Sequence, residues 1–460
     1  MDSTGGGFLV TSRTAGESGT AGEIAKTVPP DRPALPAEIA ELTDPGNRED
    51  PYPSLDKLRE RSPYKPFDGL VVVGRHAQVS ALLRDPSMSA ARDRATLSPT
   101  PRGPRTRNFL HLDPPEHTRY RRLVAGAFAR RKVAGLEPRI RRITADLIRD
   151  GAQSGTLEVV DGLAYPLPLR VICELLGVPF EDRQLLQDWS ASLSEALDPP
   201  LGPPPAPTTT TRAARARAGF VAYFRKLIEK RRGTPRDDLV SHLLQVEEEG
   251  ERLDDHDILA TCVLLLNAGH ETTVNLIGNA VLALLRHPEQ LSRLRADPTL
   301  AEAAVEEVLR YDAPVQMTTR VATRAGSIGT AEVRPGDMVL LLLGAANRDP
   351  DVYPDPGRFD IGRSPAAPHL SFSAGPHFCL GAGLARLEVA IALELFATLL
   401  VRPRLRPGDL TYKRNLNLRG PARLLVGVDV DADSDSDSDA VRPVRVSGSP
   451  PAAEGRSHGS

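Results

Sequence analysis

One cysteine near the carboxyl end of the chain lies in a glycine-rich segment whose spacing suits a metal-ligating thiolate. Cys379 has Gly375 four positions before it and Gly381 two positions after it, with His377 in between. Glycines let the backbone pass close to a flat, bulky group and adopt dihedral angles that a Cβ forbids. A thiolate that ligates haem iron needs a tight loop, nearby positive charge and partial exclusion of solvent. The alternative is a buried structural cysteine in a turn, the default role of an isolated cysteine.

An acid and an alcohol stand side by side in an otherwise apolar stretch. Glu271 and Thr272 follow Gly269 and His270 in a run that is apolar on nearly all sides from 258 to 285. Burying an ionised carboxylate there is costly without a partner, so such a residue is usually kept for a function. Gly269 leaves room for a group to approach, and the acid–alcohol pair forms a short proton relay. The alternative is a helix kink with a self-satisfied threonine and a glutamate that reaches solvent. His270 has no second ligand at metal spacing, so we assign it no metal role.

Two charges on a predicted amphipathic helix over Ala301–Tyr311 share one face. Glu307 and Arg310 are three positions apart, which allows them to pair. Such pairs are common on exposed helices, so the pair alone indicates little. The prediction of a structural role rests on a downstream proline-rich segment that carries Arg358. We predict that Arg358 completes a three-charge network that fixes this irregular segment, a structural rather than a catalytic role.

A basic helix is predicted further upstream. Asp113 is followed by two prolines, which marks a helix start. His117 and Arg121 then stand at i and i+4 on one face, a geometry suited to an anionic carboxylate. For Arg119 and Arg122 we expect an ordinary solvated basic face.

Composition indicates a globular protein without a polyanionic partner. The chain has 460 residues, 40% hydrophobic and 26% charged, with a net charge of −2, which argues against a nucleic-acid binder. Its three cysteines are an odd and sparse set that points to a reducing compartment. The longest apolar runs fall well below the ~18 residues of a membrane-spanning helix, and we see no signal peptide. We therefore expect a soluble, cytoplasmic protein.

Helical patterns dominate between two low-complexity ends. Residues 1–35 and 429–460 are expected to be disordered tails, the second carrying aspartates that alternate with small residues. Between them, apolar stripes at helical spacing cover 139–149, 220–228, 258–285 and 384–400, and short β-like runs cover 70–73 and 424–426. The Pro199–Pro207 insert is predicted to form a long exposed loop.

The four motifs, in this order over about residues 36–428, resemble bacterial soluble cytochrome P450s. The segment from Phe372 to Gly381 meets the pattern F-x-x-G-x-x-x-C-x-G of the haem loop in full. This resemblance implies one large, mainly α domain with small β-sheets and a triangular outline. The haem would lie between the central long helix and the cysteine loop. The family usually has glycine where this chain has Ser373, and serine resists positive φ, so we expect the start of the loop to differ slightly.

Carried over residue by residue, the resemblance also implies roles at the site. Cys379 would be the axial ligand of a haem b iron. The haem-binding residues would be His117, Arg121, Arg320, His377 and Cys379. Oxygen activation would involve Gly269, Glu271 and Thr272, and the structural triad would be Glu307, Arg310 and Arg358. The positions that line the substrate pocket would be Leu264, Asn267, Ala268, Val315, Gln316 and Leu416.

The implied activity is a haem-thiolate monooxygenase of secondary metabolism that hydroxylates or epoxidises a mid-sized apolar substrate with O₂. The sequence carries no flavin or iron–sulfur motif, so electrons would come from a separate ferredoxin and its reductase. Two alternatives stay open: a peroxide-driven or oxidative-coupling member of the same family, and a haem-binding protein without turnover. The long Pro199–Pro207 loop, placed where the family has a substrate-access lid, suggests a bulky substrate such as a macrolide, polyketide, terpenoid or steroid.

Overall fold

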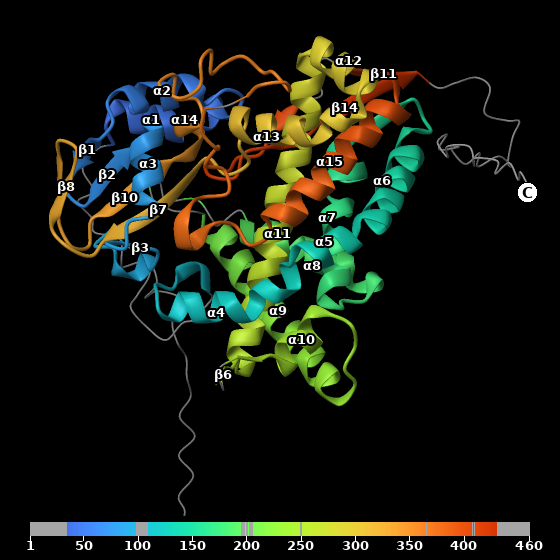
Figure 1. Ribbon diagram of the computed structural model, residues 1–460, viewed down its shortest axis with the longest axis horizontal. Coiled ribbons are helices and arrows are strands. Elements are labelled where there is room, and N and C mark those ends of the chain that lie inside the picture. Colours follow the sequence, from blue (N-terminus) through green and yellow to red (C-terminus); the bar gives the residue numbers. More distant parts are fainter. Residues whose placement is uncertain are drawn as a thin grey trace, which may run out of the picture.

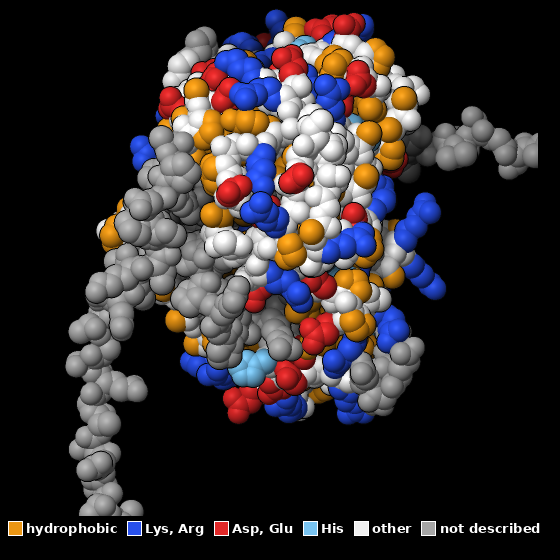
Figure 2. All heavy atoms as spheres, turned by 90° about the vertical axis from the view of Figure 1, so that its left-hand side faces the viewer, with side chains coloured by type: hydrophobic (Ala, Val, Ile, Leu, Met, Phe, Trp, Pro, Cys, Tyr) orange, Lys and Arg blue, Asp and Glu red, His pale blue; other side chains and the backbone are white. Residues whose placement is uncertain are grey.

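The computed structural model describes residues 35–97, 109–194, 198, 201, 206–248, 251–364, 366–406, 408 and 410–429. A sheet-containing region with the first three helices lies on the left of Figure 1, and a larger helical region fills the right. On the face shown in Figure 2, lysines and arginines are interspersed with aspartates and glutamates, in keeping with the near-zero net charge. No helix in the described ranges is long and apolar enough to cross a membrane.

Helices make up most of the described chain, as the periodicity predicted. The first eight are α1 Ala37–Thr43, α2 Tyr52–Glu60, α3 His76–Leu82, α4 Glu116–Ala125, α5 Arg130–Gly135, α6 Glu137–Ala152, α7 Pro166–Leu176 and α8 Arg183–Ser194. The others are α9 Pro207–Gly233, α10 Leu239–Gln245, α11 Asp255–Arg286, α12 Pro288–Ala296, α13 Ala301–Tyr311, α14 Leu343–Ala346 and α15 Ala382–Leu399. The predicted helix over Ala301–Tyr311 is confirmed at both ends, and the stripes at 139–149, 220–228, 258–285 and 384–400 fall in α6, α9, α11 and α15.

The long helix α11 runs through the middle of the molecule. It begins with a capping box in which Asp254 and Asp257 each accept a backbone N–H of the other, which satisfies orphan donors of the first turn. It ends where His287 and Pro288 follow, since proline cannot continue a helix. Helices α7, α9, α13 and α15 all pack against α11. The central helix is therefore buried along most of its length and can present side chains to the interior.

The strands form small sheets at the periphery. The largest has the order β1-β2-β10-β7-β3, with β10 parallel to β2 and antiparallel to β7. The strands of this sheet are β1 Tyr64–Phe67, β2 Leu70–Val73, β3 Met88–Ser89, β7 Met317–Ala322 and β10 Met338–Leu342. The smaller sheets contain β4 Thr156–Glu158, β5 Glu247–Glu248, β6 Glu251–Arg252, β8 Gly326–Ile328, β9 Ala331–Val333, β11 Val401–Leu405, β12 Thr411–Tyr412, β13 Pro421–Arg423 and β14 Leu425–Asp429. The β-like run at 70–73 is confirmed as β2, and the run at 424–426 overlaps β14.

Some predicted segment boundaries differ from those in the structure, and others fall outside the described residues. Asp429, which we placed in the carboxyl-terminal tail, ends β14 and pairs with Arg402 and Arg404 of β11 at 3.2 and 2.7 Å. The ladder with β11 holds this residue in the sheet. Residues 1–34 and 430–460 lie outside the described residues, as does most of the predicted 199–207 loop. Pro207 itself is the first residue of α9, a position that tolerates proline.

One buried carboxyl in α15 has no charged partner among the described residues and gives a stability prediction. Glu388 is 3% exposed, and burial raises its pKa to about 8 from 4.5. Because the folded state holds this proton more tightly, stability falls by about 1.4 kcal/mol per unit as pH rises between these two values. Glu388→Gln is therefore expected to be more stable than the parent protein near pH 8, with the gap closing towards pH 4.5.

Denaturant unfolding at several pH values checks this expectation. The matched control is Glu394→Gln on the same helix, because Glu394 pairs with Arg141 at 2.6 Å and should only lose stability when neutralised. If the difference in free energy of unfolding between Glu388→Gln and the parent stays constant across this pH range, Glu388 is not a buried carboxyl without a compensating partner.

Candidate active site

The cysteine loop is a tight turn that leads directly into α15. The N–H of Cys379 donates to the carbonyl of Phe372 at 2.9 Å, which closes the loop. Gly375 has φ +68, and a Cβ there would lie 2.9 Å from the carbonyl oxygen of Leu83. Both the backbone angle and the close approach therefore require glycine at this position.

Ser373 adopts the conformation that we expected it to resist. Its φ is +62, in the left-handed region that favours glycine. The hydrogen bond from its N–H to the carbonyl of Leu370, 2.8 Å long, holds the residue in this conformation. The expected displacement of the loop start was therefore wrong: the loop keeps a glycine-like geometry, and the serine bears the local backbone cost.

The thiol of Cys379 lies where solvent can reach it although protein surrounds it. Burial raises its pKa, while hydrogen bonds from the backbone N–H groups of Gly381 and Ala382 and the charge of Arg121 act in the opposite direction. The residue is exposed on one side, yet the surrounding protein atoms desolvate its thiol. These backbone donors and Arg121 are what a ligating thiolate requires.

Four cationic or imidazole side chains gather beside this loop. His117 and His377 stack with ring centroids 4.0 Å apart. Both ring nitrogens of the buried His117 lack a hydrogen-bond partner. Burial, and then the charges of His117 and Arg320, lower the pKa of His377 to about 3. Burial also lowers the pKa values of Arg121 and Arg320, the latter to about 10.

No ion pair to Arg121 or Arg320 is present among the described residues, although Arg320 is buried and Arg121 is partly buried. Buried cations are normally paired. A ligand with two carboxylates beside the cysteine would supply the missing partners, so these residues fit the propionates of a haem. The structure thus places His117, Arg121, Arg320 and His377 together, as the sequence predicted.

The middle of α11 carries the predicted acid–alcohol pair. Ala268 and Gly269 are exposed although the helix around them is buried, and a Cβ on Gly269 would meet nothing within 4 Å. The hydroxyl of Thr272 donates to the Ala268 carbonyl at 2.8 Å, and Thr273 does the same to Gly269. This open stretch of helix can accommodate the flat group that the cysteine loop would hold from the other side.

Glu271 is buried and does not reach solvent, which removes the kinked-helix alternative for this residue. Its carboxylate accepts hydrogen bonds from Lys413 and from the Tyr165 hydroxyl, the latter at 3.0 Å. His270 is a core histidine: its ring packs against that of Tyr165 at an interplanar angle of 60°, and burial lowers its pKa to about 4. No group of three or more metal-ligating side chains occurs in the described part of the chain.

The charge network on α13 forms with a different third member. Arg310 and Glu307 make two hydrogen bonds of 2.8 Å, and both side chains are buried. The third charge is Arg363, whose Nε donates to Glu307 at 3.1 Å. Arg358 was predicted wrongly: its side chain is 66% exposed and pairs with Asp360 at 3.5 Å. Only the backbone carbonyl of Arg358 takes part, as an acceptor for Arg310 and Arg363.

The residues predicted to line the substrate pocket fall into two groups. Leu264, Asn267 and Ala268 lie on α11 close to the acid–alcohol pair, and the Asn267 amide oxygen accepts a hydrogen bond from buried Ser190 at 3.1 Å. Val315 lies just before β7 and forms an isolated bridge with Leu418.

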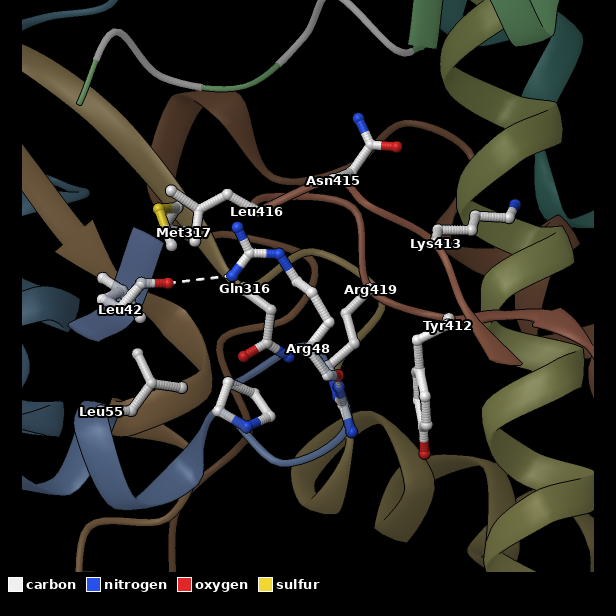
Figure 3. Close-up of a pocket in the computed structure, with 12 residues that line it drawn as sticks. Leu42, Arg48, Leu55, Gln316, Met317, Tyr412, Lys413, Asn415, Leu416 and Arg419 are labelled. Atoms are coloured by element: carbon white, nitrogen blue, oxygen red, sulfur yellow. Dashed lines mark hydrogen bonds between the residues drawn. The ribbon is translucent and has the colours of Figure 1, made fainter. Parts of the chain in front are cut away.

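Gln316 and Leu416 form the second group. Figure 3 shows them lining a small pocket together with Leu42, Arg48 and Leu55 of the amino-terminal region. Gln316 donates to the Ala313 carbonyl at 2.7 Å, and its oxygen lies where a Cβ on Gly344 would be. Its side chain therefore points towards α2 and α14, and neither Cys379 nor Thr272 lines this pocket.

Comparison with known proteins decides the family. The cytochrome P450 family model matches residues 66–402. The chain belongs to the cytochrome P450 family. Two curated relatives are the 6-deoxyerythronolide B hydroxylase of Saccharopolyspora erythraea, 40% identical over 70% of this chain and 78% of the relative, and the vitamin D(3) 25-hydroxylase of Pseudonocardia autotrophica, 39% identical over 82% and 94%. The crystal structure of CYP164A2 from Mycobacterium smegmatis in its ligand-free state is 45% identical, with a TM-score of 0.79 over 85% of this chain and 99% of that one.

Membership in the family confirms the predicted P450 fold, mainly α with small sheets, and the haem-thiolate cofactor. The protein is a bacterial cytochrome P450 monooxygenase, an oxidoreductase that incorporates oxygen from O₂. Bacterial P450s receive electrons from redox partners such as ferredoxins.

Sequence reasoning missed Tyr165, Lys413 and Arg363. Tyr165 and Lys413 are 106 and 142 positions from the glutamate that they contact, so no local spacing reveals them. Arg363 lies only five residues after Arg358, in a segment without regular structure where periodicity gives no orientation.

Proposed function

We propose that this P450 inserts one oxygen atom into a bulky, mainly apolar molecule in secondary metabolism, by hydroxylation or epoxidation. The observation that carries the site assignment is the group His117, Arg121, Arg320 and His377 beside Cys379, which lacks an ionic partner among the described residues. Cys379 would ligate the iron, and these four residues would hold the propionates. A bound haem would supply the oxygen chemistry, since ligation of its iron by a thiolate favours O–O cleavage.

The residues of α11 would position the substrate and deliver protons. Ala268 and Gly269 leave space beside the helix for a ligand, while Leu264 contributes apolar surface. With its oxygen held by Ser190, the Asn267 amide can donate a hydrogen bond to a substrate oxygen. Thr272 would pass protons that Glu271 supplies from its buried position.

A bulky substrate is supported by two features. Relatives are named for 6-deoxyerythronolide B and for vitamin D(3). The chain also inserts a proline-rich segment at 199–207 between α8 and α9. We therefore propose a macrolide, polyketide, terpenoid or steroid substrate.

We propose further that a separate ferredoxin and its reductase supply the electrons and that the protein works in the cytoplasm. In keeping with a reducing compartment, none of the three cysteines forms a disulfide. Residues 36–428 would form the catalytic domain, extended to Asp429 by β14, and the flanking tails would be dispensable for it.

A spin-state titration of the haem-loaded protein against a panel of macrolides, polyketides, terpenoids and steroids tests the proposal. We expect at least one class to give a saturable spectral shift and a product heavier by one oxygen atom when ferredoxin, reductase and O₂ are supplied. Turnover with hydrogen peroxide but none with the electron donors would favour the peroxide-driven alternative. Spectral binding without oxygen consumption would favour a non-catalytic haem protein.

A further inference from the structure

The proton-relay acid is held by a lysine from the far end of the chain. Glu271 and Lys413 form an ion pair in which the two side chains are 4% and 13% exposed. Within the described residues, the three other lysine ion pairs, Lys57–Glu41, Lys65–Asp68 and Lys65–Asp337, each involve a more exposed lysine. Attraction between two charges is much stronger when water is excluded, so this pair should fix its carboxylate firmly.

Lys413 reaches Glu271 from the hairpin of β12 and β13. Its backbone N–H donates to Gly420 at 3.1 Å, which closes the hairpin, and its ammonium lies 5.2 Å from the centre of the Tyr165 ring. Tyr165 precedes α7 and donates its hydroxyl to the second oxygen of Glu271. The ionisable groups that face the carboxylate are thus Lys413 from the hairpin, Tyr165 from the α7 side and His270 from α11 itself.

The hairpin is itself anchored to the elements around the site. The N–H groups of Leu416 and Asn417 donate to Asp198 at 2.9 Å, and the Asn415 amide donates to the carbonyl of Ser194 at the end of α8. Lys413 is therefore fixed to a segment that contacts the end of α8.

We propose that Lys413 is a positioning residue for Glu271: it holds the carboxylate oriented beside Thr272, and so sets the rate of proton delivery. This inference rests on the proposed function of the acid–alcohol pair. Tyr165 completes the arrangement by holding the second carboxylate oxygen.

The test compares Lys413→Met with Lys413→Arg in the haem-loaded protein. We expect Lys413→Met to lower the rate of product formation roughly 10- to 100-fold, as a displaced reacting group does. The solvent deuterium isotope effect should rise, and more hydrogen peroxide should be released per electron donor consumed. Lys413→Arg keeps the charge and should restore most of the rate. The matched control Lys57→Met removes an exposed lysine from an ion pair and should leave both readouts unchanged.

A second measurement does not depend on turnover. Without Lys413 the carboxylate of Glu271 stays buried without its counter-charge, so the melting temperature of Lys413→Met should fall. Adding Glu271→Gln should abolish most of that loss. Additive effects of the two substitutions, or parent-like rates and isotope effects in Lys413→Met, would overturn the proposal. If the parent protein itself fails to turn over any substrate, the proposed function fails, while the additivity test still decides whether Lys413 holds Glu271.

Discussion

Replacing Arg310 with methionine is expected to leave little folded, haem-loaded protein. The guanidinium donates two hydrogen bonds to Glu307 and one each to the carbonyls of Asn347, Pro356 and Arg358. Breaking a buried ion pair from one side costs about 3 to 5 kcal/mol, and each orphaned acceptor adds about 1 to 3 kcal/mol. This sum equals much of the stability of a typical protein, about 5 to 15 kcal/mol.

The neighbouring arginines provide graded controls for this prediction. Arg358→Ala removes only an exposed pair and should change stability by less than about 1 kcal/mol. Arg363→Ala removes one of the three charges, and its loss of stability should lie between those of Arg310→Met and Arg358→Ala. Expression yield, haem content and denaturant unfolding measure the series. A stable Arg310→Met, or an Arg358→Ala that is as damaging, would show that we have assigned the network wrongly.

Replacing Glu271 with glutamine is expected to lower kcat about 100-fold or more while the haem spectrum stays that of the parent. Glutamine keeps the shape of the side chain but cannot donate and recover a proton, and a positioned acid typically contributes about 10² to 10⁴ in rate. The substitution also leaves Lys413 without its counter-charge, so melting temperature must be followed in parallel.

Steady-state turnover with a reconstituted ferredoxin system measures this effect. Thr273→Ala is the matched control on the same helix, because Thr273 makes the same type of bond to a carbonyl four residues back but is buried. We expect it to retain most of the activity. A Glu271→Gln enzyme with parent-like kcat would place the proton source elsewhere.

Features encoded over short stretches were predicted well. Apolar spacing located α6, α9, α11, α13 and α15, because each helix buries one stripe or its whole surface. The cysteine loop and the His117–Arg121 face were read from local spacing, and the structure brings both together with Arg320 and His377.

Features that depend on tertiary packing were not predictable. The third charge of the network lies in an irregular segment, so the side chain that turns inward is selected by the fold and not by spacing. Gln316 lies beside β7, and its orientation towards α2 follows from the packing of α14 against that helix. The partner of Glu271, Lys413, lies 142 positions away in the sequence. Only the folded structure shows that this lysine contacts the glutamate.

The proposed oxygen chemistry depends most on the bond between the Cys379 sulfur and haem iron. The most direct measurement is the absorption spectrum of the reduced protein under carbon monoxide, recorded for the parent and for Cys379→His. We expect the parent to show the red-shifted Soret band of a haem-thiolate complex and the variant to show that of a nitrogen-ligated haem. A parent spectrum typical of nitrogen ligation, or a variant that keeps the thiolate band, would contradict it.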